Sequence, residues 1–393
     1  MSRSFECPKT ERVVYGVDAT NDLLGYLRSL GVARPFIVAS HTLATTTEVV
    51  DRLAGLSNAV GTYHAVPAHV PREAVLEVAE RCRDAGADGV VSIGGGSPID
   101  CAKLAALCLS EGIMNASGLE RQRVKYQHPG PPEIPSHGGT LVPHVAVPTT
   151  LSGGEFTRIA GSVDGTRGVK DIFQADGMTP RIVILDPAIA RHTPEWLWLA
   201  SGMRAIDHII EGVCSLRSTT LTDAVLLRAL RTFVDDLLLS AADPDDLGSR
   251  ERCQVAAWMA IMFLQNVGTG LSHALGHQLG AQFRIPHGVT SCILLPPVMN
   301  FNRPVTASSQ AKLAEAFGID IRGLEDEEAA EAAEQELRRL LAATGLPTRL
   351  RDVEVSREHF GGLIENILED MVVGGNPRPV TGADIRSVLE AAY

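Results

Sequence analysis

Three histidines lie close together in the segment GLSHALGHQLGAQFRIPHG, residues 270–288. His273 and His277 are four residues apart and share one face of a predicted helix, and His287 follows in a Pro-His-Gly turn. Grouped imidazoles can bind a transition metal or carry a proton near neutral pH. The segment is therefore a candidate metal or proton-transfer site, with hydrogen-bonded core histidines as the alternative.

A second polar window, SGMRAIDHIIEG, covers residues 201–212. His208 lies four residues after Arg204, so the two share a helical face, whereas Asp207 is expected to point elsewhere. A guanidinium stays charged at physiological pH and can hold both oxygens of a carboxylate. This window therefore adds a cation and a fourth imidazole to the candidate chemistry.

A glycine-rich loop stands in the sequence VVSIGGGSPIDCAK, where Gly94, Gly95, Gly96 and Ser97 follow a predicted buried strand. A helix is expected to begin at Pro98, and free N–H groups at a helix start can bind a pyrophosphate. The motif is neither GxGxxG nor a P-loop, so an ordinary strand-to-helix turn is the alternative.

A second loop, VPTTLSGGEFT, brings Thr149, Thr150 and Ser152 after another predicted strand. Open α/β sheets bind ligands at the carboxyl edge of their strands, which is where these hydroxyl groups are expected. Hydroxyl side chains also cap helices, so a capping role is the alternative.

Short apolar runs alternate with amphipathic stretches up to about residue 190, which predicts a parallel sheet flanked by helices. The expected strands are 35–40, 61–66, 89–95, 144–150 and 181–186, and the expected helices are 72–85 and 98–109. The stretch around Asp164-Gly165 predicts a β-hairpin with a primed turn. Beyond Glu195 the segments are rich in Ala, Leu, Glu and Arg, which predicts helices. We expect an α/β domain over residues 1–190 and an all-helical domain over residues 191–393.

The composition is that of a globular protein, with 393 residues, 45% hydrophobic and 21% charged. The net charge of −12, without a Lys/Arg cluster, argues against a nucleic-acid or anionic-membrane surface. The longest apolar run, 255–264, has half the ~20 residues that span a bilayer, and no hydrophobic signal core is expected at the start. The seven cysteines form no CxxC pair and are expected to be reduced. We expect a cytoplasmic protein with a small-molecule partner, no nucleic acid and no membrane.

The motifs GGGSP, PTT, SGMxxxxH and HALGHQLG...PHG resemble the iron-type (group III) alcohol dehydrogenase family and its maleylacetate reductase relatives. The resemblance implies an N-terminal dinucleotide-binding α/β domain, a helical catalytic C-terminal domain and an active site in the cleft between them. It also implies an NAD(P)-dependent alcohol dehydrogenase or reductase (EC 1.1.1 or 1.3.1 type) and a homodimer.

Site residues carry over from the resemblance by position. The residues implied for the dinucleotide are Gly94, Gly95, Gly96, Ser97 and Asp100 around the pyrophosphate and nicotinamide, Thr149, Thr150 and Ser152 in the nucleotide cleft, and Lys170 near the ribose. His277 would face substrate and nicotinamide. Ser40-His41 follows the first of the predicted strands, where NAD-selective members often carry an Asp, so both NAD(H) and NADP(H) are expected cofactors.

Metal-dependent members hold iron or zinc with residues that map to positions 204, 208, 273 and 287, but position 204 is Arg rather than Asp. The guanidinium would repel a divalent cation held by His208, His273 and His287. Maleylacetate reductases also lack that Asp and are thought to work without metal on an acidic keto compound. The hypothesis is that Arg204 replaces the metal, by anchoring a substrate carboxylate or by polarising the carbonyl. In the alternative, Arg204 pairs with Asp207 or Glu211 and the three histidines bind metal.

In the mechanism expected here, reduced nicotinamide gives a hydride to a carbonyl, and a nearby cation stabilises the oxygen. Arg204, or protonated His277 or His208, is the candidate cation, and His277 before His287 is the candidate proton donor. Two other functions remain open: a metal-dependent (Fe or Zn) alcohol dehydrogenase, and a dinucleotide-binding protein that has lost catalysis.

Overall fold

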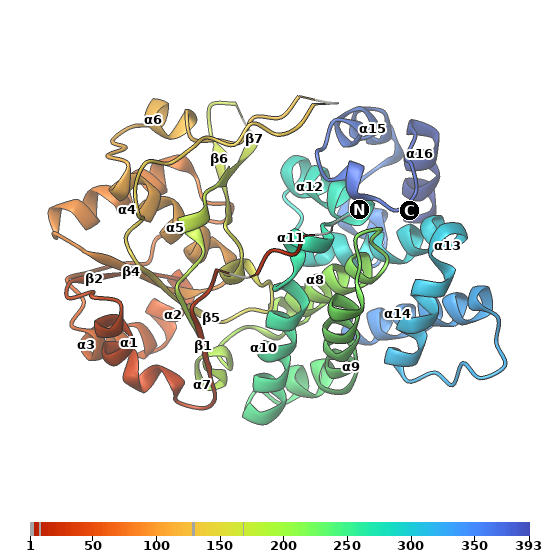
Figure 1. Cartoon of the computed structure of the whole chain (residues 1–393), viewed down its shortest axis with the longest axis horizontal. Coiled ribbons are helices and arrows are strands. Elements are labelled where there is room, and N and C mark those ends of the chain that lie inside the picture. Colours follow the sequence, from red (N-terminus) through yellow and green to blue (C-terminus); the bar gives the residue numbers. More distant parts are fainter. Residues whose placement is uncertain (1–3, 8, 128–129, 168) are drawn as a thin grey trace. The chain divides into compact units, whose positions relative to one another are not determined.

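The computed structural model describes residues 4–7, 9–127, 130–167 and 169–393. The chain divides into two compact units, which are described separately (Figure 1). The α/β unit comprises Pro8–Tyr126 and Pro132–Thr193. The helical unit comprises Pro194–Tyr393 and two short segments from earlier in the chain.

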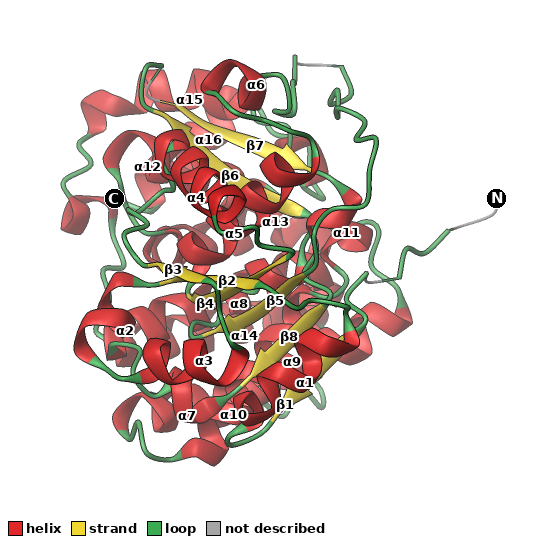
Figure 2. Ribbon diagram, turned by 90° about the vertical axis from the view of Figure 1, so that its left-hand side faces the viewer, coloured by secondary structure: helices red, strands yellow, loops and turns green. Residues whose placement is uncertain are grey.

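A six-stranded parallel sheet forms the centre of the α/β unit, with the strand order β1-β8-β5-β4-β2-β3 (Figure 2). Its strands are β1 (Arg12–Tyr15), β2 (Pro35–Ala39), β3 (Gly61–Tyr63), β4 (Gly89–Gly94), β5 (His144–Pro148) and β8 (Ile182–Leu185). Strands β2, β4, β5 and β8 are buried along their whole length, as parallel strands covered on both faces must be. The five predicted strands are thus confirmed, and β1 at the sheet edge was not predicted.

Helices cover both faces of this sheet. They are α1 (Leu23–Ser29), α2 (His41–Thr46), α3 (Val49–Ser57), α4 (Arg72–Asp84), α5 (Gly96–Ser110), α6 (Ala116–Glu120) and α7 (Pro187–Ala190), with short 3-10 turns η1 (Ala19–Asp22), η2 (Gly154–Phe156) and η3 (Asp176–Met178). Alternate residues of β2 enter different cores: Phe36 and Val38 pack with α4 and α5, while Ile37 and Ala39 pack with α1 and α3. The two predicted helices are confirmed, although α5 begins two residues before Pro98.

The predicted hairpin is present as β6 (Ile159–Asp164) and β7 (Val169–Gln174), but the primed turn is wrong. Asp164 pairs with Val169, so four residues rather than two connect the strands. Asp164 Oδ1 accepts hydrogen bonds from the backbone N–H groups of Thr166 and Arg167, and no described residue of the connection has the positive φ that a primed turn needs. The aspartate side chain therefore closes this turn.

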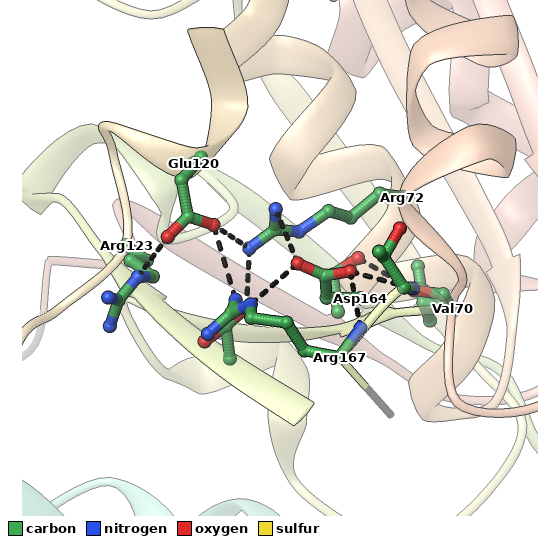
Figure 3. Close-up of polar contacts among 9 residues, drawn as sticks. Val70, Arg72, Glu120, Arg123, Asp164 and Arg167 are labelled. Carbon is green, nitrogen blue, oxygen red and sulfur yellow. Dashed lines mark hydrogen bonds and ion pairs between the residues drawn. The ribbon is translucent and has the colours of Figure 1, made fainter. Parts of the chain in front are cut away.

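A network of ion pairs fastens the hairpin to α4 and α6 (Figure 3). The buried guanidinium of Arg72 meets the carboxylates of Asp164, Asp171 and Glu120. Arg167 contacts the same three carboxylates, and its hydrogen bond is the largest cause that lowers the pKa of Asp164 to about 2. The three carboxylates therefore have arginine partners.

The helical unit contains the long helices that carry the histidine windows. They are α8 (Glu195–Val213), α9 (Thr220–Ala242), α10 (Leu247–Ile261), α11 (Leu264–Val267), α12 (Leu271–Phe283), α13 (His287–Phe317), α14 (Asp326–Thr344), α15 (Phe360–Leu368) and α16 (Gly382–Ala391), with 3-10 turns η4 (Leu350–Val353), η5 (Arg357–His359) and η6 (Val373–Gly375). Every residue of α8 from Trp198 to Val213 is buried, so its polar side chains must find partners inside the protein.

No single helix of the described residues is long and apolar enough to cross a membrane. One pair of consecutive segments, Leu247–Val267 and Leu271–Phe283, is together long and apolar enough, but the two are bent by 105° relative to each other.

Candidate active site

The glycine loop joins β4 to α5 in a conformation that requires glycine. Gly94 has a φ of 140°, and a Cβ there would lie 2.9 Å from Cβ of Ser40. A Cβ on Gly95 would lie 3.0 Å from Cγ2 of Thr150. Gly95 is the N-cap of α5 and provides no side-chain cap, so the first N–H groups of this helix can bind an anion.

The threonine-serine loop lies beside the glycine loop because β4 and β5 are adjacent in the sheet. Gly94 pairs with Pro148, and the backbone N–H of Thr149 donates to the carbonyl of Gly94 at 3.0 Å. Oγ1 of Thr150 and Oγ of Ser152 are 3.1 Å apart. A Cβ on Gly96 would make only ordinary contact, 4.0 Å from Oγ of Ser152. The two loops thus bring backbone donors and hydroxyl groups together at the carboxyl ends of β4 and β5. This arrangement fits a phosphate group.

Three other predicted cofactor residues have structural contacts. Ser40 caps α2, because its Oγ accepts from the N–H of Leu43 at 3.2 Å. Asp100 Oδ2 accepts from the N–H of Gly161 in β6 at 3.1 Å. Lys170 lies across Gly161, where a Cβ would collide with it. Asp100 therefore links α5 to the hairpin, while the contact of Lys170 with Gly161 lies within the hairpin.

Lys103 is a buried residue of α5 that the sequence analysis did not select. Its Nζ donates to the carbonyls of Gly154, Thr157 and Ile159 at 2.6, 2.7 and 2.9 Å. Burial lowers the pKa of Lys103 to about 8, and burial raises the pKa of neighbouring Glu155 to about 7. A lysine among the apolar residues of a predicted helix was the available signal. Lys103 fixes the segment that follows the threonine-serine loop.

A buried polar cluster in the helical unit joins α8 to α12. Nδ1 of His273 is 2.7 Å from Oε2 of Glu211, and this oxygen also accepts the N–H of Gly270 at 2.7 Å. The other carboxylate oxygen, Oε1, accepts the N–H of Ser272 at 2.7 Å. Asp207 Oδ2 accepts from Oγ of Ser272 at 3.0 Å and from Oγ of Ser291 at 2.6 Å. Both carboxylates thus have several protein donors.

Arg204 belongs to the same cluster. Its Nη1 lies 3.4 Å from Oδ2 of Asp207 and 3.2 Å from Oγ of Ser291. Asp207 therefore does not point elsewhere, since residues three apart are neighbours on a helix. Within the described part of the chain, Nε and Nη2 of Arg204 have no hydrogen bond, and the side chain is 11% exposed. Two guanidinium nitrogens are left for a ligand.

The histidines differ in burial and partners. The rings of His208 and His273 are 4.7 Å apart, and those of His277 and His287 are 6.0 Å apart, centroid to centroid. Burial is the main cause that holds the pKa of both His208 and His273 well below the usual range, and the positive charge of Arg204 lowers both pKa values further. These two imidazoles are therefore neutral at physiological pH.

His277 forms a pair that the sequence analysis missed. Its Nδ1 lies 3.1 Å from Oδ2 of Asp370, a residue that follows α15. The His277 side chain is 36% exposed, whereas that of His273 is 4% exposed. Ninety-three positions separate Asp370 from His277, and no local pattern connects them.

Comparisons with known proteins place the chain in a family. Residues 10–187 match the sequence model of the iron-containing alcohol dehydrogenases, and residues 198–393 match the C-terminal region of the Fe-containing alcohol dehydrogenase family. The chain belongs to the iron-containing alcohol dehydrogenase family. Lactaldehyde reductase of Escherichia coli (strain K12) is 30% identical over 390 residues, which is 98% of each chain. NAD-dependent methanol dehydrogenase of Bacillus methanolicus is 31% identical over 389 residues, 96% of this chain and 97% of that one.

Solved structures agree with membership of the iron-containing alcohol dehydrogenase family. A 1,3-propanediol oxidoreductase superimposes with a TM-score of 0.91 and 27% identity over 100% of both chains. A maleylacetate reductase from Agrobacterium tumefaciens gives a TM-score of 0.81 at 24% identity over 100% of this chain and 99% of that one, which shows a shared fold. The predicted family, the predicted fold class and the expectation of an oxidoreductase are confirmed.

The name of the iron-containing alcohol dehydrogenase family implies a metal, and the cluster of Asp207, Glu211 and His273 does not fit one. Among the described residues, His273 groups with Asp207 and Glu211 within 4.8 Å, while His208 and His287 join no such group. The two carboxylates already accept protein donors, and Arg204 brings a permanent positive charge to the cluster. A divalent cation would have to displace those donors and sit beside a guanidinium.

Proposed function

We propose that this chain is an NAD(H)- or NADP(H)-dependent oxidoreductase that interconverts a small carbonyl compound and its alcohol without a metal. The proposed substrate class is an acidic keto compound, of the kind that maleylacetate reductases reduce. The observation that carries this proposal is Arg204, a buried cation with two nitrogens that have no hydrogen bond in the described part of the chain. A guanidinium fork suits a carboxylate or a polarised carbonyl oxygen.

The α/β unit supplies the proposed dinucleotide site. Gly94, Gly95, Gly96 and Ser97 would hold the pyrophosphate at the start of α5, and Thr150 and Ser152 would add hydroxyl donors. The relative from Bacillus methanolicus is named as NAD-dependent, which supports this class of cofactor. Ser40 has no carboxylate that would repel a 2'-phosphate, so we propose that both cofactors bind.

The helical unit supplies the proposed catalytic side chains, Arg204 and His277. When bound, reduced nicotinamide supplies the hydride. Arg204 binds the substrate carboxylate or stabilises the negative charge that grows on the carbonyl oxygen. His277, the more exposed imidazole, gives the proton to that oxygen, while buried His273 and His208 stay neutral.

One observation favours a metal-dependent alternative. Nδ1 of His273 is hydrogen-bonded to Glu211, and the buried Nε2 has no partner among the described residues. Metal-binding imidazoles often use their other nitrogen in this way. Zinc or iron held by this nitrogen, His208 and His287 is therefore the second candidate function.

The test is oxidation of NADH and NADPH in the presence of keto acids and aldehydes, with and without a chelator, on protein of known metal content. The expected result is turnover of a keto acid by metal-free protein. Activity that needs one equivalent of tightly bound metal would overturn the proposal. We also propose a homodimer, which light scattering of the purified protein would test.

A further inference from the structure

Hydrogen bonds hold both the side chain and the backbone of Asp370 in place. Its Oδ1 accepts the backbone N–H of Val372 at 3.0 Å, and its own N–H donates to the carbonyl of Ile367 at 3.0 Å. The side chain is 10% exposed. Oδ2 remains to meet Nδ1 of His277 at 3.1 Å. Asp370 therefore presents one oxygen to the imidazole in a fixed position.

The chemistry of this contact decides where the proton of His277 lies. An ionised carboxylate can only accept a hydrogen bond, so Nδ1 of His277 must be the donor. The neutral ring then has its lone pair on Nε2, and Nε2 becomes the atom that takes up and releases a proton. Nε2 has no hydrogen bond to any described residue, and the side chain is 36% exposed.

We propose that Asp370 is a positioning residue that fixes the tautomer and the orientation of His277, so that Nε2 faces the substrate. This inference rests on the proposed function, in which His277 is the proton donor. A carboxylate that orients an imidazole is a general device of proton transfer, because it stabilises the imidazolium and prevents the wrong tautomer.

A second imidazole–carboxylate pair on the same helix shows why His277 is the one concerned. His273 and Glu211 have the same chemistry, at 2.7 Å, but both side chains are less than a tenth exposed. The other groups near His277 are the ring of His287 on α13 and, through their charges, Glu211 on α8 and His273 on α12. Asp370 is the group that hydrogen-bonds His277 in the described part of the chain.

The experiment compares Asp370→Asn and Asp370→Glu with a matched control, Glu369→Gln, which removes the adjacent exposed carboxylate. Histidine-selective ¹⁵N NMR reads the tautomer of each ring, and the His277→Ala spectrum assigns the His277 signal. Thermal unfolding confirms that each variant folds. The wild type is expected to show the Nδ1–H tautomer of His277, and Asp370→Asn is expected to lose it.

Turnover gives the second reading. Asp370→Asn is expected to lower kcat by about 10- to 100-fold with unchanged dinucleotide affinity, Asp370→Glu to restore part of the loss, and Glu369→Gln to change nothing. An Nε2–H tautomer in the wild type, or full kcat in Asp370→Asn, would overturn the positioning role. If His277→Ala is fully active, the proposed role of His277 fails instead, and the NMR result for Asp370 tells the two failures apart.

Discussion

Arg204 and Asp207, three residues apart on α8, form a hydrogen bond of 3.4 Å inside the protein. The same Asp207 oxygen also accepts two serine hydroxyl groups, so the carboxylate keeps partners if the arginine is removed. Nη1 of Arg204 thus makes the hydrogen bonds to the protein, while Nε and Nη2 have none in the described part of the chain. This arrangement allows each proposed role of the cluster to be tested by substitution.

Arg204→Ala is expected to lower kcat/KM for an acidic keto substrate by about 100- to 1000-fold, because one preorganised donor at a developing oxyanion contributes an effect of that size. The affinity for dinucleotide should not change. Steady-state kinetics with cofactor titration by fluorescence measure both quantities. A variant with normal kcat/KM would show that Arg204 is only a structural partner of Asp207.

Arg204→Asp is expected to bind a metal that the wild type, on the proposed function, does not bind. The new carboxylate removes the positive charge and adds an oxygen ligand near His208 and His273. Elemental analysis after incubation with zinc or iron should find about one equivalent of bound metal per chain in the variant. Arg204→Asn is the matched control, because it removes the charge without adding an anionic ligand. Equal metal content in all three proteins would contradict the prediction.

His277→Ala is expected to reduce kcat by ~100-fold or more through loss of a general acid. Dinucleotide affinity should be nearly unchanged, since the proposed pyrophosphate loop lies in the α/β unit. Single-turnover kinetics, which isolate the chemical step, provide the measurement. Retention of the wild-type rate would remove His277 from the mechanism.

Gly96→Ala is expected to weaken dinucleotide binding by at least ~10-fold without lowering thermal stability. A Cβ at this position makes only ordinary contact inside the protein, but it would occupy the start of α5, where the phosphate is proposed to bind. Gly94→Ala, in contrast, should destabilise the protein, because its φ is positive and Ser40 is too close. Unfolding scans and equilibrium binding separate the two effects. Unchanged affinity in Gly96→Ala would exclude this loop as the phosphate site.

The free energy of unfolding of Glu155→Gln is expected to increase relative to that of the wild type as the pH rises. The pKa of Glu155 is raised by burial from 4.5 to about 7, so between these values the folded state binds more protons than the unfolded state. Wild-type stability therefore falls as the pH rises through this window, by at most about 3 kcal/mol for this group. Urea unfolding at about pH 5 and about pH 8 measures the difference. A pH-independent difference between variant and wild type would show that Glu155 is ionised throughout.

Local patterns were sufficient to predict five of the six strands of the sheet and the glycine loop. Strands such as β4 and β5 are continuous apolar runs between turn residues, and their burial requires no knowledge of distant partners. Strand β1 was missed because it is four residues long, lies at the sheet edge and has exposed ends. The predicted primed turn was wrong because the connection has four residues and the Asp164 side chain accepts the N–H groups of Thr166 and Arg167.

The polar cluster was harder to predict because its members are chosen by tertiary contacts. The family resemblance placed His208, His273 and His287 together, yet His273 groups with two carboxylates of α8. The partner of His277 comes from a segment beyond α15, and its sequence has no periodicity that links it to α12. Helical spacing identifies shared faces, but it does not say which element lies opposite each face.

The backbone donors of Gly270 and Ser272 hold Glu211, and two serine hydroxyl groups hold Asp207, so none of these contacts depends on the side chain at position 204. A single substitution there can reverse the sign of the local charge while the surrounding hydrogen bonds persist. On the proposed function, one residue of a scaffold whose hydrogen bonds stay the same therefore determines whether a guanidinium or an ion acts on the carbonyl oxygen.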